Sequence, residues 1–175
     1  MTEPLTSAPI LETERLSLRG PMKCDLPELT RFMTTSPRMQ SMGETVSEEQ
    51  AWFGFMIGIG HWHWHGFGFF TVTLQGQSLP LGRVGLLKHS NWPSVELAWH
   101  LFEGAEGKGY ATEAAIAVRS WAYQMHGFKQ LVSYIDCSNH RSQAVARRLG
   151  ATTDGTRADH EPKAEVWVHL SEPQG

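Results

Sequence analysis

Hydrophobic and polar residues alternate in several short segments of the chain, and a period of two residues predicts β-strands. In the first of these segments the alternation starts at Arg15 and stops at Gly20 and Pro21. Residues with a strong preference for turns separate the later segments from one another. The predicted strands are residues 11–19, 69–74, 81–88, 95–101, 131–135 and 165–170.

Four other segments carry hydrophobic residues at helical spacing and begin at polar residues that can cap a helix. Asp25 and Ser47 each stand three residues before a Glu or a Gln, which is the spacing of a capping box. Ser138 or Asn139 is the expected cap of the last helix. The predicted helices are residues 26–33, 48–65, 111–125 and 140–149.

The order of these elements is strand, two helices, three strands, then helix, strand, helix and strand. Such an order predicts an α+β or mixed α/β fold with a largely antiparallel sheet. The chain of 175 residues shows no repeat and no linker, so it predicts one domain over residues 10–171. Residues 1–9 are polar and contain proline, and we expect them to form a disordered lead.

Composition narrows the classes of protein to which the chain can belong. A net charge of −3 at pH 7 argues against a nucleic-acid partner. No apolar run reaches the roughly 18 residues that a membrane-spanning helix needs, and residues 1–9 lack the pattern of a secretory signal. Cys24 and Cys137 do not have the spacing of a disulfide framework or a zinc site. We therefore expect a cytoplasmic protein that binds neither membrane nor nucleic acid.

Two glycines, Gly107 and Gly109, lie between the strand at 95–101 and the long helix that follows. Glycine adopts a positive φ without strain and lets a ligand approach the backbone closely. A turn of this kind directs bare N–H groups at a phosphate, together with those of the helix N-terminus. The segment therefore predicts a loop that binds a pyrophosphate.

Four segments resemble, in their order and spacing, the GNAT superfamily of acyl-CoA-dependent N-acyltransferases and, within it, the RimJ/RimL-type branch. The first three are LETERLSLR at 11–19, LGRVGL at 81–86 and EGKGYATEAA at 106–115. The fourth begins with DCSN at 136–139, continues through Ser142 and ends with RLGA at 148–151. The resemblance extends over residues 11–170. The loop departs from the family pattern at Glu106, where a neutral or basic side chain is usual. An acid beside a pyrophosphate is unfavourable unless its side chain points to solvent.

The resemblance implies a single GNAT-type domain whose twisted mixed sheet is flanked by helices and splays at the cofactor site. It implies acetyl-CoA as the co-substrate, and no metal. The residues implied to contact the cofactor are Trp99, Leu101, Glu106, Gly107, Lys108, Gly109, Tyr110, Ala111, Thr112, Asn139 and Ser142. For Asn139 a simple N-cap is the alternative. Arg147 and Arg148 are candidates to meet the CoA phosphates, but a solvated face is the favoured interpretation for both.

Acetyl transfer from a thioester to an amine requires an unprotonated amine and a stabilised oxyanion. The resemblance implies direct attack without an acyl-enzyme, with Glu96 accepting the amine proton directly or through water. The alternative is that Glu96 is an ordinary sheet carboxylate paired with a base such as Arg83. His100 shares a strand face with Glu96 and is a weaker candidate for the same role.

The departing thiolate needs a proton donor. The resemblance implies that Ser142 helps to bind CoA or protonates the thiolate. Many members of the family carry a tyrosine general acid four residues later, but that position is Ala146 in this chain. Tyr110 and Tyr134 are weaker substitutes.

The acceptor implied by the resemblance is a primary amine, and the RimJ/RimL-type branch suggests a protein N-terminal amine such as that of a ribosomal protein. A small-molecule amine is the alternative, and a non-catalytic acyl-CoA-binding module is the interpretation from another class. We expect a monomer or a homodimer. Candidates for the wall of the acceptor pocket, with core packing as the alternative, are Met39, Met42, Trp52 and Trp92.

Three histidines, His61, His63 and His65, alternate with tryptophans and invite a metal-site interpretation. No acidic residue nearby completes such a site. We therefore expect this segment to be the end of the second helix.

Overall fold

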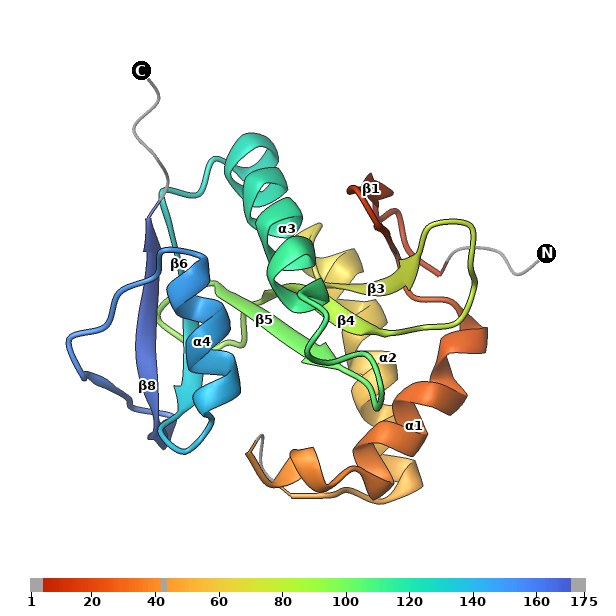
Figure 1. Ribbon diagram of the computed structural model, residues 1–175, viewed down its shortest axis with the longest axis horizontal. Helices are drawn as coiled ribbons and strands as arrows, with labels where there is room; N and C mark the ends of the chain where they lie inside the picture. Colours follow the sequence, from red (N-terminus) through yellow and green to blue (C-terminus); the bar gives the residue numbers. More distant parts are fainter. Residues whose placement is uncertain (1–4, 42–43, 171–175) are drawn as a thin grey trace.

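In the computed structural model, which describes residues 5–41 and 44–170, eight strands form one mixed sheet in the order β1-β2-β3-β4-β5-β6-β8-β7 (Figure 1). Every neighbouring pair is antiparallel except β5 and β6. This confirms the predicted mixed, mostly antiparallel sheet. The strands are β1 Leu11–Glu12, β2 Leu16–Arg19, β3 Phe69–Leu74, β4 Gly82–Leu87, β5 Glu96–Leu101, β6 Gln130–Asp136, β7 Arg157–Ala158 and β8 Glu161–Leu170.

Helices cover both faces of the sheet, with α3 and α4 in front of it and α2 behind it in Figure 1. The α-helices are α1 Leu26–Thr35, α2 Glu48–His65, α3 Tyr110–His126 and α4 His140–Arg148, and 3-10 turns span Lys23–Asp25 and Pro37–Ser41. Among the described residues, no helix combines the length and the apolar character needed to cross a bilayer.

The main core lies between α3 and the strands. Val84 and Leu86 of β4 are fully buried there against Ala114 and Val118 of α3. A second cluster fills the space between α1 and α2 on the other face, where the Phe32 and Phe102 rings lie 5.1 Å apart between centroids. The sheet is therefore buried on both faces, and its polar side chains need partners inside the fold.

Capping residues and turn residues in the sequence predicted the positions of most helices and strands correctly. Ser47 caps α2 in a reciprocal capping box with Gln50, and α2 continues through the three histidines to a left-handed Gly66. Asn139 caps α4 through a bond from the Ser142 amide, and Gly127 ends α3 in a left-handed conformation. The side chains of Ser47 and Asn139 satisfy backbone N–H groups at the helix starts, and Gly66 and Gly127 adopt the positive φ that ends a helix. Such local signals are why the sequence alone locates these ends.

The expected first strand is instead two short strands, β1 and β2. Thr13 makes a tight turn between them: its amide donates to the Leu16 carbonyl at 2.9 Å, and its hydroxyl accepts from the Leu16 amide at 3.0 Å. The strand at 165–170 is also longer than expected, because β8 begins at Glu161 and pairs with the additional strand β7. From the expected lead, Leu5 and Ala8 contact the second and the main cluster.

Asp25 does not cap α1 with its side chain, so that prediction is wrong. The carboxylate accepts bonds of 2.8 Å from both terminal nitrogens of Arg19, from the Met22 amide and from the Thr71 hydroxyl. The Asp25 side chain is only 5% exposed. Pairing with a buried cation outweighs capping, because an unpaired Arg19 would be far more costly than an uncapped helix end.

Candidate functional site

The strands β5 and β6 diverge after a single point of contact. They pair at one position, Glu96 opposite Val132. Beyond it, side chains take the place of ladder bonds: the Ser133 hydroxyl donates to the Leu97 carbonyl at 2.6 Å, and a Glu96 carboxylate oxygen accepts from the Tyr134 amide at 3.3 Å. A gap therefore opens within the sheet without leaving these backbone groups unsatisfied.

A buried histidine supports this gap from β8. His169 Nε2 lies 2.9 Å from the Ser133 hydroxyl oxygen. Since Ser133 gives its own proton to Leu97, the Nε2–H of His169 is the donor in this contact. Burial lowers the pKa of His169 to about 4, so the ring is neutral at physiological pH.

The glycine loop has the predicted backbone conformation. Gly107 and Gly109 have φ values of 77° and 83°, in the left-handed region. Gly109 is the N-cap residue of α3, and no side chain caps that helix end. The first N–H groups of α3 are thus available to a ligand.

Arg15 fixes the loop from the far end of the sequence. Its Nη1 donates to the Lys108 carbonyl at 3.0 Å, its Nε donates to Glu113 at 2.7 Å, and its guanidinium lies 4.8 Å from the Tyr110 ring centroid. Glu113 also accepts from the Thr13 hydroxyl at 2.6 Å. The loop is therefore held in its shape by contacts within the protein.

A cleft of about 870 Å³ runs from this loop to the start of α4. Most of the residues implied to contact a cofactor line it: Trp99, Leu101, Glu106, Gly107, Gly109, Ala111, Thr112, Asn139 and Ser142. Lys108 and Tyr110 are not among the lining residues. Of the arginines on α4, Arg141 and Arg148 line the cleft, whereas Arg147 lies over the Trp167 ring.

Arg38 lies beside Glu106, the acid that departs from the family pattern. Glu106 lies 3.8 Å from Nε of Arg38, which also pairs with Glu103 at 3.2 Å. Arg38 follows the first helix and reaches the cleft from the other face. Its positive charge offsets the carboxylate at the cleft, an arrangement that nothing in the local sequence around Glu106 signals.

At the other end of the cleft, Trp99 orients Ser142. The indole Nε1–H donates to the Ser142 hydroxyl oxygen at 3.3 Å. The hydroxyl proton of Ser142 remains available to a ligand. Asn139 both caps α4 and lines the cleft, so its two predicted roles are compatible in position.

A second cavity, of about 160 Å³, lies in the gap between β5 and β6 and is rich in carboxylates. Glu96, Asp136 and Glu161 line it, and it shares Trp99, His100, Asn139 and Ser142 with the cleft. Glu161 carried no sequence signal, and it begins β8 opposite Ala158 of the short strand β7. The two cavities therefore meet around one set of side chains.

Glu96 is the buried carboxylate of this cavity. Burial raises its pKa to about 8, the bond from the Tyr134 amide acts against that rise, and the charge of Glu161 adds to it. Glu96 does not pair with Arg83, whose Nε instead donates to Nδ1 of His100 at 3.0 Å. Burial, with the charges of Arg83 and Arg38, lowers the pKa of His100 well below its usual value.

The histidines at the end of α2 have structural partners. His61 contacts the Phe67 carbonyl through Nδ1 at 2.8 Å and accepts from the Lys88 amide through Nε2 at 2.9 Å. Over residues 5–41 and 44–170, no three His, Cys, Asp or Glu side chains are grouped as metal ligands. Of the proposed pocket-wall residues, Met39 is buried in the second cluster, Trp52 is largely exposed, and Met42 lies outside the described residues.

Comparison with known proteins agrees with this architecture. A family model described as an acetyltransferase (GNAT) domain matches residues 15–152. An acetyltransferase from Agrobacterium tumefaciens strain C58 is 36% identical and superposes with a TM-score of 0.89, over 94% of this chain and 96% of that one. RimL, a ribosomal L7/L12 α-N-protein acetyltransferase solved with coenzyme A, shares the fold at 16% identity and a TM-score of 0.69, over 93% and 98% of the two chains.

An uncharacterised N-acetyltransferase of Bacillus subtilis strain 168, YnaD, is 24% identical over 98 residues. The aligned part is 56% of this chain and 58% of that protein. The family model and the similarity to the Agrobacterium enzyme together place the present chain: it belongs to the GNAT family of acetyltransferases.

Proposed function

We propose that this protein transfers the acetyl group of acetyl-CoA to a primary amine by direct attack on the thioester. The observation that carries the proposal is the meeting of the cleft with the carboxylate-rich cavity around Trp99, His100, Asn139 and Ser142. A donor in the cleft and an amine in the cavity would approach each other there. Holding two reactants in this way removes much of the entropic cost of their encounter.

The donor would bind along the cleft. The N–H groups at Gly107, Gly109 and the start of α3 would receive the pyrophosphate, and Arg141 and Arg148 would add positive charge. Leu101 and Trp99 would line the path of the arm towards the gap between β5 and β6. Lys108 would contribute through its backbone N–H, since its side chain does not line the cleft.

The chemistry would be divided between two side chains. Glu96 would accept the amine proton, a role that suits a carboxyl group whose pKa of about 8 lies near the operating pH. Ser142 would donate its hydroxyl proton towards the departing thiolate, because Trp99 occupies its acceptor side. Ala146, at the position where relatives carry a tyrosine acid, is fully buried and offers no proton.

We propose residues 10–171 as the catalytic domain and the cytoplasm as its compartment, as a monomer or a homodimer. The similarity to RimL favours a protein N-terminal amine as the acceptor, and a small-molecule amine is the second candidate. Ser142 and Glu96, placed on either side of the same junction, favour an enzyme over a non-catalytic acyl-CoA-binding module.

The function is tested by the release of free thiol from acetyl-CoA in the presence of N-terminal peptides and small amines. We expect turnover with at least one acceptor, and stabilisation of the protein by acetyl-CoA alone. Tight binding of CoA without turnover on any amine would favour the binding module. The absence of any thermal shift with acetyl-CoA would contradict both interpretations.

Replacement of Gly107 by Ala is expected to weaken acetyl-CoA binding about fivefold to thirtyfold. A Cβ at this position meets no atom within 4 Å, so the cost arises from the positive φ alone. Holding a non-glycine residue in the left-handed region costs roughly 1–2 kcal/mol. The affinity is measured by calorimetric titration with CoA.

Gly76 provides the matched control, since it has φ 70° in the β3–β4 turn and equally open surroundings. Gly76→Ala should lose similar stability but retain its affinity for CoA. Equal losses of affinity in both variants would show that the loop conformation is not what binds the donor.

A further inference from the structure

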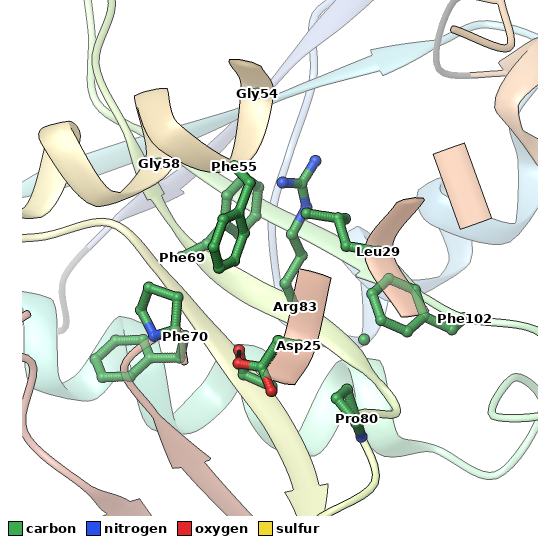
Figure 2. A pocket seen from close by; sticks show the side chains of 13 residues that line it. Asp25, Leu29, Gly54, Phe55, Gly58, Phe69, Phe70, Pro80, Arg83 and Phe102 are labelled. Atoms are coloured by element: carbon green, nitrogen blue, oxygen red, sulfur yellow. Dashed lines mark hydrogen bonds between the residues drawn. The ribbon is translucent and has the colours of Figure 1, made fainter. Parts of the chain in front are cut away.

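A small cavity of about 40 Å³ lies behind the sheet, between β3 and β4 on one side and α1 and α2 on the other. Its walls are mainly apolar and are formed by Leu29, Gly54, Phe55, Gly58, Phe69 and Phe102. Figure 2 shows the Arg83 side chain extending from β4 into this cavity, towards Gly54 and Phe55. The cavity thus combines apolar walls with a single guanidinium group.

The positive charge of Arg83 is not balanced within the described part of the chain. None of the ion pairs among residues 5–41 and 44–170 includes it. Asp25 lines the same cavity, but its carboxylate is fully engaged by Arg19, the Met22 amide and Thr71. The head of Arg83 also points away from that carboxylate (Figure 2).

Arg83 nevertheless remains charged at neutral pH. Burial lowers its pKa to about 10, and no neighbouring carboxylate acts against that shift. The protein supplies only neutral partners: Nδ1 of His100 accepts from Nε at 3.0 Å, and the Phe69 ring lies 4.4 Å from the guanidinium carbon. Both terminal nitrogens remain as a planar pair of donors, which matches the two oxygens of a carboxylate.

Two glycines on α2 keep the space above Arg83 open. Gly54 and Gly58 are one helical turn apart and face the cavity. A Cβ at Gly58 would meet nothing within 4 Å, and one at Gly54 would meet only the end of Met33 at 3.8 Å. Arg83 is half-buried, and a cation partly withdrawn from water beside empty space is stabilised when an anion completes its contacts.

This cationic cavity is linked to the reaction centre through His100. That ring binds Arg83 and lines both the cleft and the carboxylate-rich cavity. An acceptor lying along β5 would therefore meet carboxylates at one end, where an amine fits, and a guanidinium at the other. The arrangement suits a molecule that carries an amine and a carboxylate.

We propose that Arg83 binds the carboxylate of the acceptor, so that the acceptor is a primary amine bearing a carboxylate group. The proposal rests on the acetyl-transfer function proposed above. The carboxylate belongs either to a free amino acid or to an acidic side chain near the N-terminus of a peptide. Both sources present the same chemistry to Arg83.

The test compares matched acceptors in which a neutral amide replaces the carboxylate. Free α-amino acids are paired with their carboxamides, and peptides with Asp or Glu at the second position are paired with Asn or Gln peptides. In at least one pair, we expect kcat/KM for the acid to be at least tenfold higher than for its neutral partner, mainly because its KM is lower. The pair that shows the preference identifies the source of the carboxylate.

Arg83→Gln should abolish that preference, measured as the ratio of kcat/KM for the acid to kcat/KM for its neutral partner, and Arg83→Lys should retain part of it. Arg31→Gln is the control, since Arg31 is an exposed arginine of α1 that pairs with Glu28. Equal rates for the two members of every pair in the wild type would overturn the proposal. An equal loss of kcat/KM for the acid and for its neutral partner in Arg83→Gln would also overturn it.

A binding measurement separates this proposal from the proposed function. Without acetyl-CoA, the preferred acid should raise the melting temperature of the wild type but not that of Arg83→Gln. If no amine is acetylated yet this difference persists, the carboxylate site stands and the acetyl-transfer function fails. If amines are acetylated but no acid stabilises the wild type through Arg83, the function stands and the carboxylate site fails.

Discussion

Glu96→Gln is expected to lower kcat/KM by about 10²–10⁴, the usual contribution of a general base. Glutamine keeps the shape of the side chain and can still accept the bond from the Tyr134 amide, which is 3.3 Å from the Glu96 carboxylate. The gap between β5 and β6 should therefore persist, and only proton acceptance is lost. Initial rates of thiol release measure the effect.

The pH profile provides a sharper readout than the rate itself. With a lysine-like acceptor of pKa near 10.4, the wild type needs both a free amine and an ionised Glu96. Because the pKa of Glu96 is about 8, log kcat/KM should rise with slope 2 below pH 8 and slope 1 above it. Glu96→Gln should show slope 1 throughout. An unchanged profile and rate would exclude Glu96 as the base.

Glu161→Gln is the informative companion, because it removes the other carboxylate whose charge acts on Glu96. The break between the two slopes should move to lower pH. If this variant instead loses activity while Glu96→Gln retains it, the proton acceptor is Glu161.

The same pKa shift links Glu96 to stability. An ordinary glutamate loses its proton near pH 4.5, whereas the folded protein retains the proton of Glu96 until about pH 8. Between these values the unfolded state is the more deprotonated, so the free energy of unfolding falls as the pH rises. Glu96→Gln lacks this dependence. Its melting temperature relative to the wild type should therefore increase from pH 5 to pH 9.

Asp25→Ala is expected to lower the free energy of unfolding by about 3–5 kcal/mol, the usual cost of leaving one partner of a buried ion pair alone. The change strands the Arg19 guanidinium and removes the acceptor of the Met22 amide and the Thr71 hydroxyl. Urea unfolding at pH 7 measures the loss.

Glu28→Ala serves as the control for this prediction. Glu28 forms the i,i+3 pair of α1 with Arg31, whose side chain is 60% exposed, and such pairs contribute less than about 1 kcal/mol. Comparable losses of unfolding free energy in the two variants would show that the Arg19–Asp25 pair contributes no more to stability than an exposed ion pair does. Asp25→Asn should fall between them, because it retains an acceptor for Thr71 but not the charge.

The accuracy of the sequence predictions depended on whether a feature was encoded locally. Ser47 and Asn139 cap helices by accepting from amides three residues away, so the sequence located both helix starts. Gly107 and Gly109 needed their left-handed φ for reasons that also lie within a few residues. The conformation of the glycine loop and most of the strands could therefore be predicted.

Features that depend on distant partners were not predictable in this way. Arg15 holds a loop 93 residues away, and Arg38 offsets the charge of an acid on the other side of the sheet. Asp25 had the spacing of a cap, yet its carboxylate binds Arg19 on β2 and Thr71 on β3 instead. Pairing across a fold leaves no periodicity in the sequence, so these assignments required the structure.

The divergence of β5 from β6 also creates an edge in the middle of a sheet. An exposed edge strand is normally a hazard, because its unpaired N–H and C=O groups recruit strands from other molecules and promote aggregation. Here the open edge of β5 lies between β6, α3 and α4 (Figure 1), and Trp99, His100 and Leu101 of that strand line the cleft. A thin, flexible chain with amide groups can still reach it. The fold thus offers backbone pairing at this edge to a ligand that lies in the cleft.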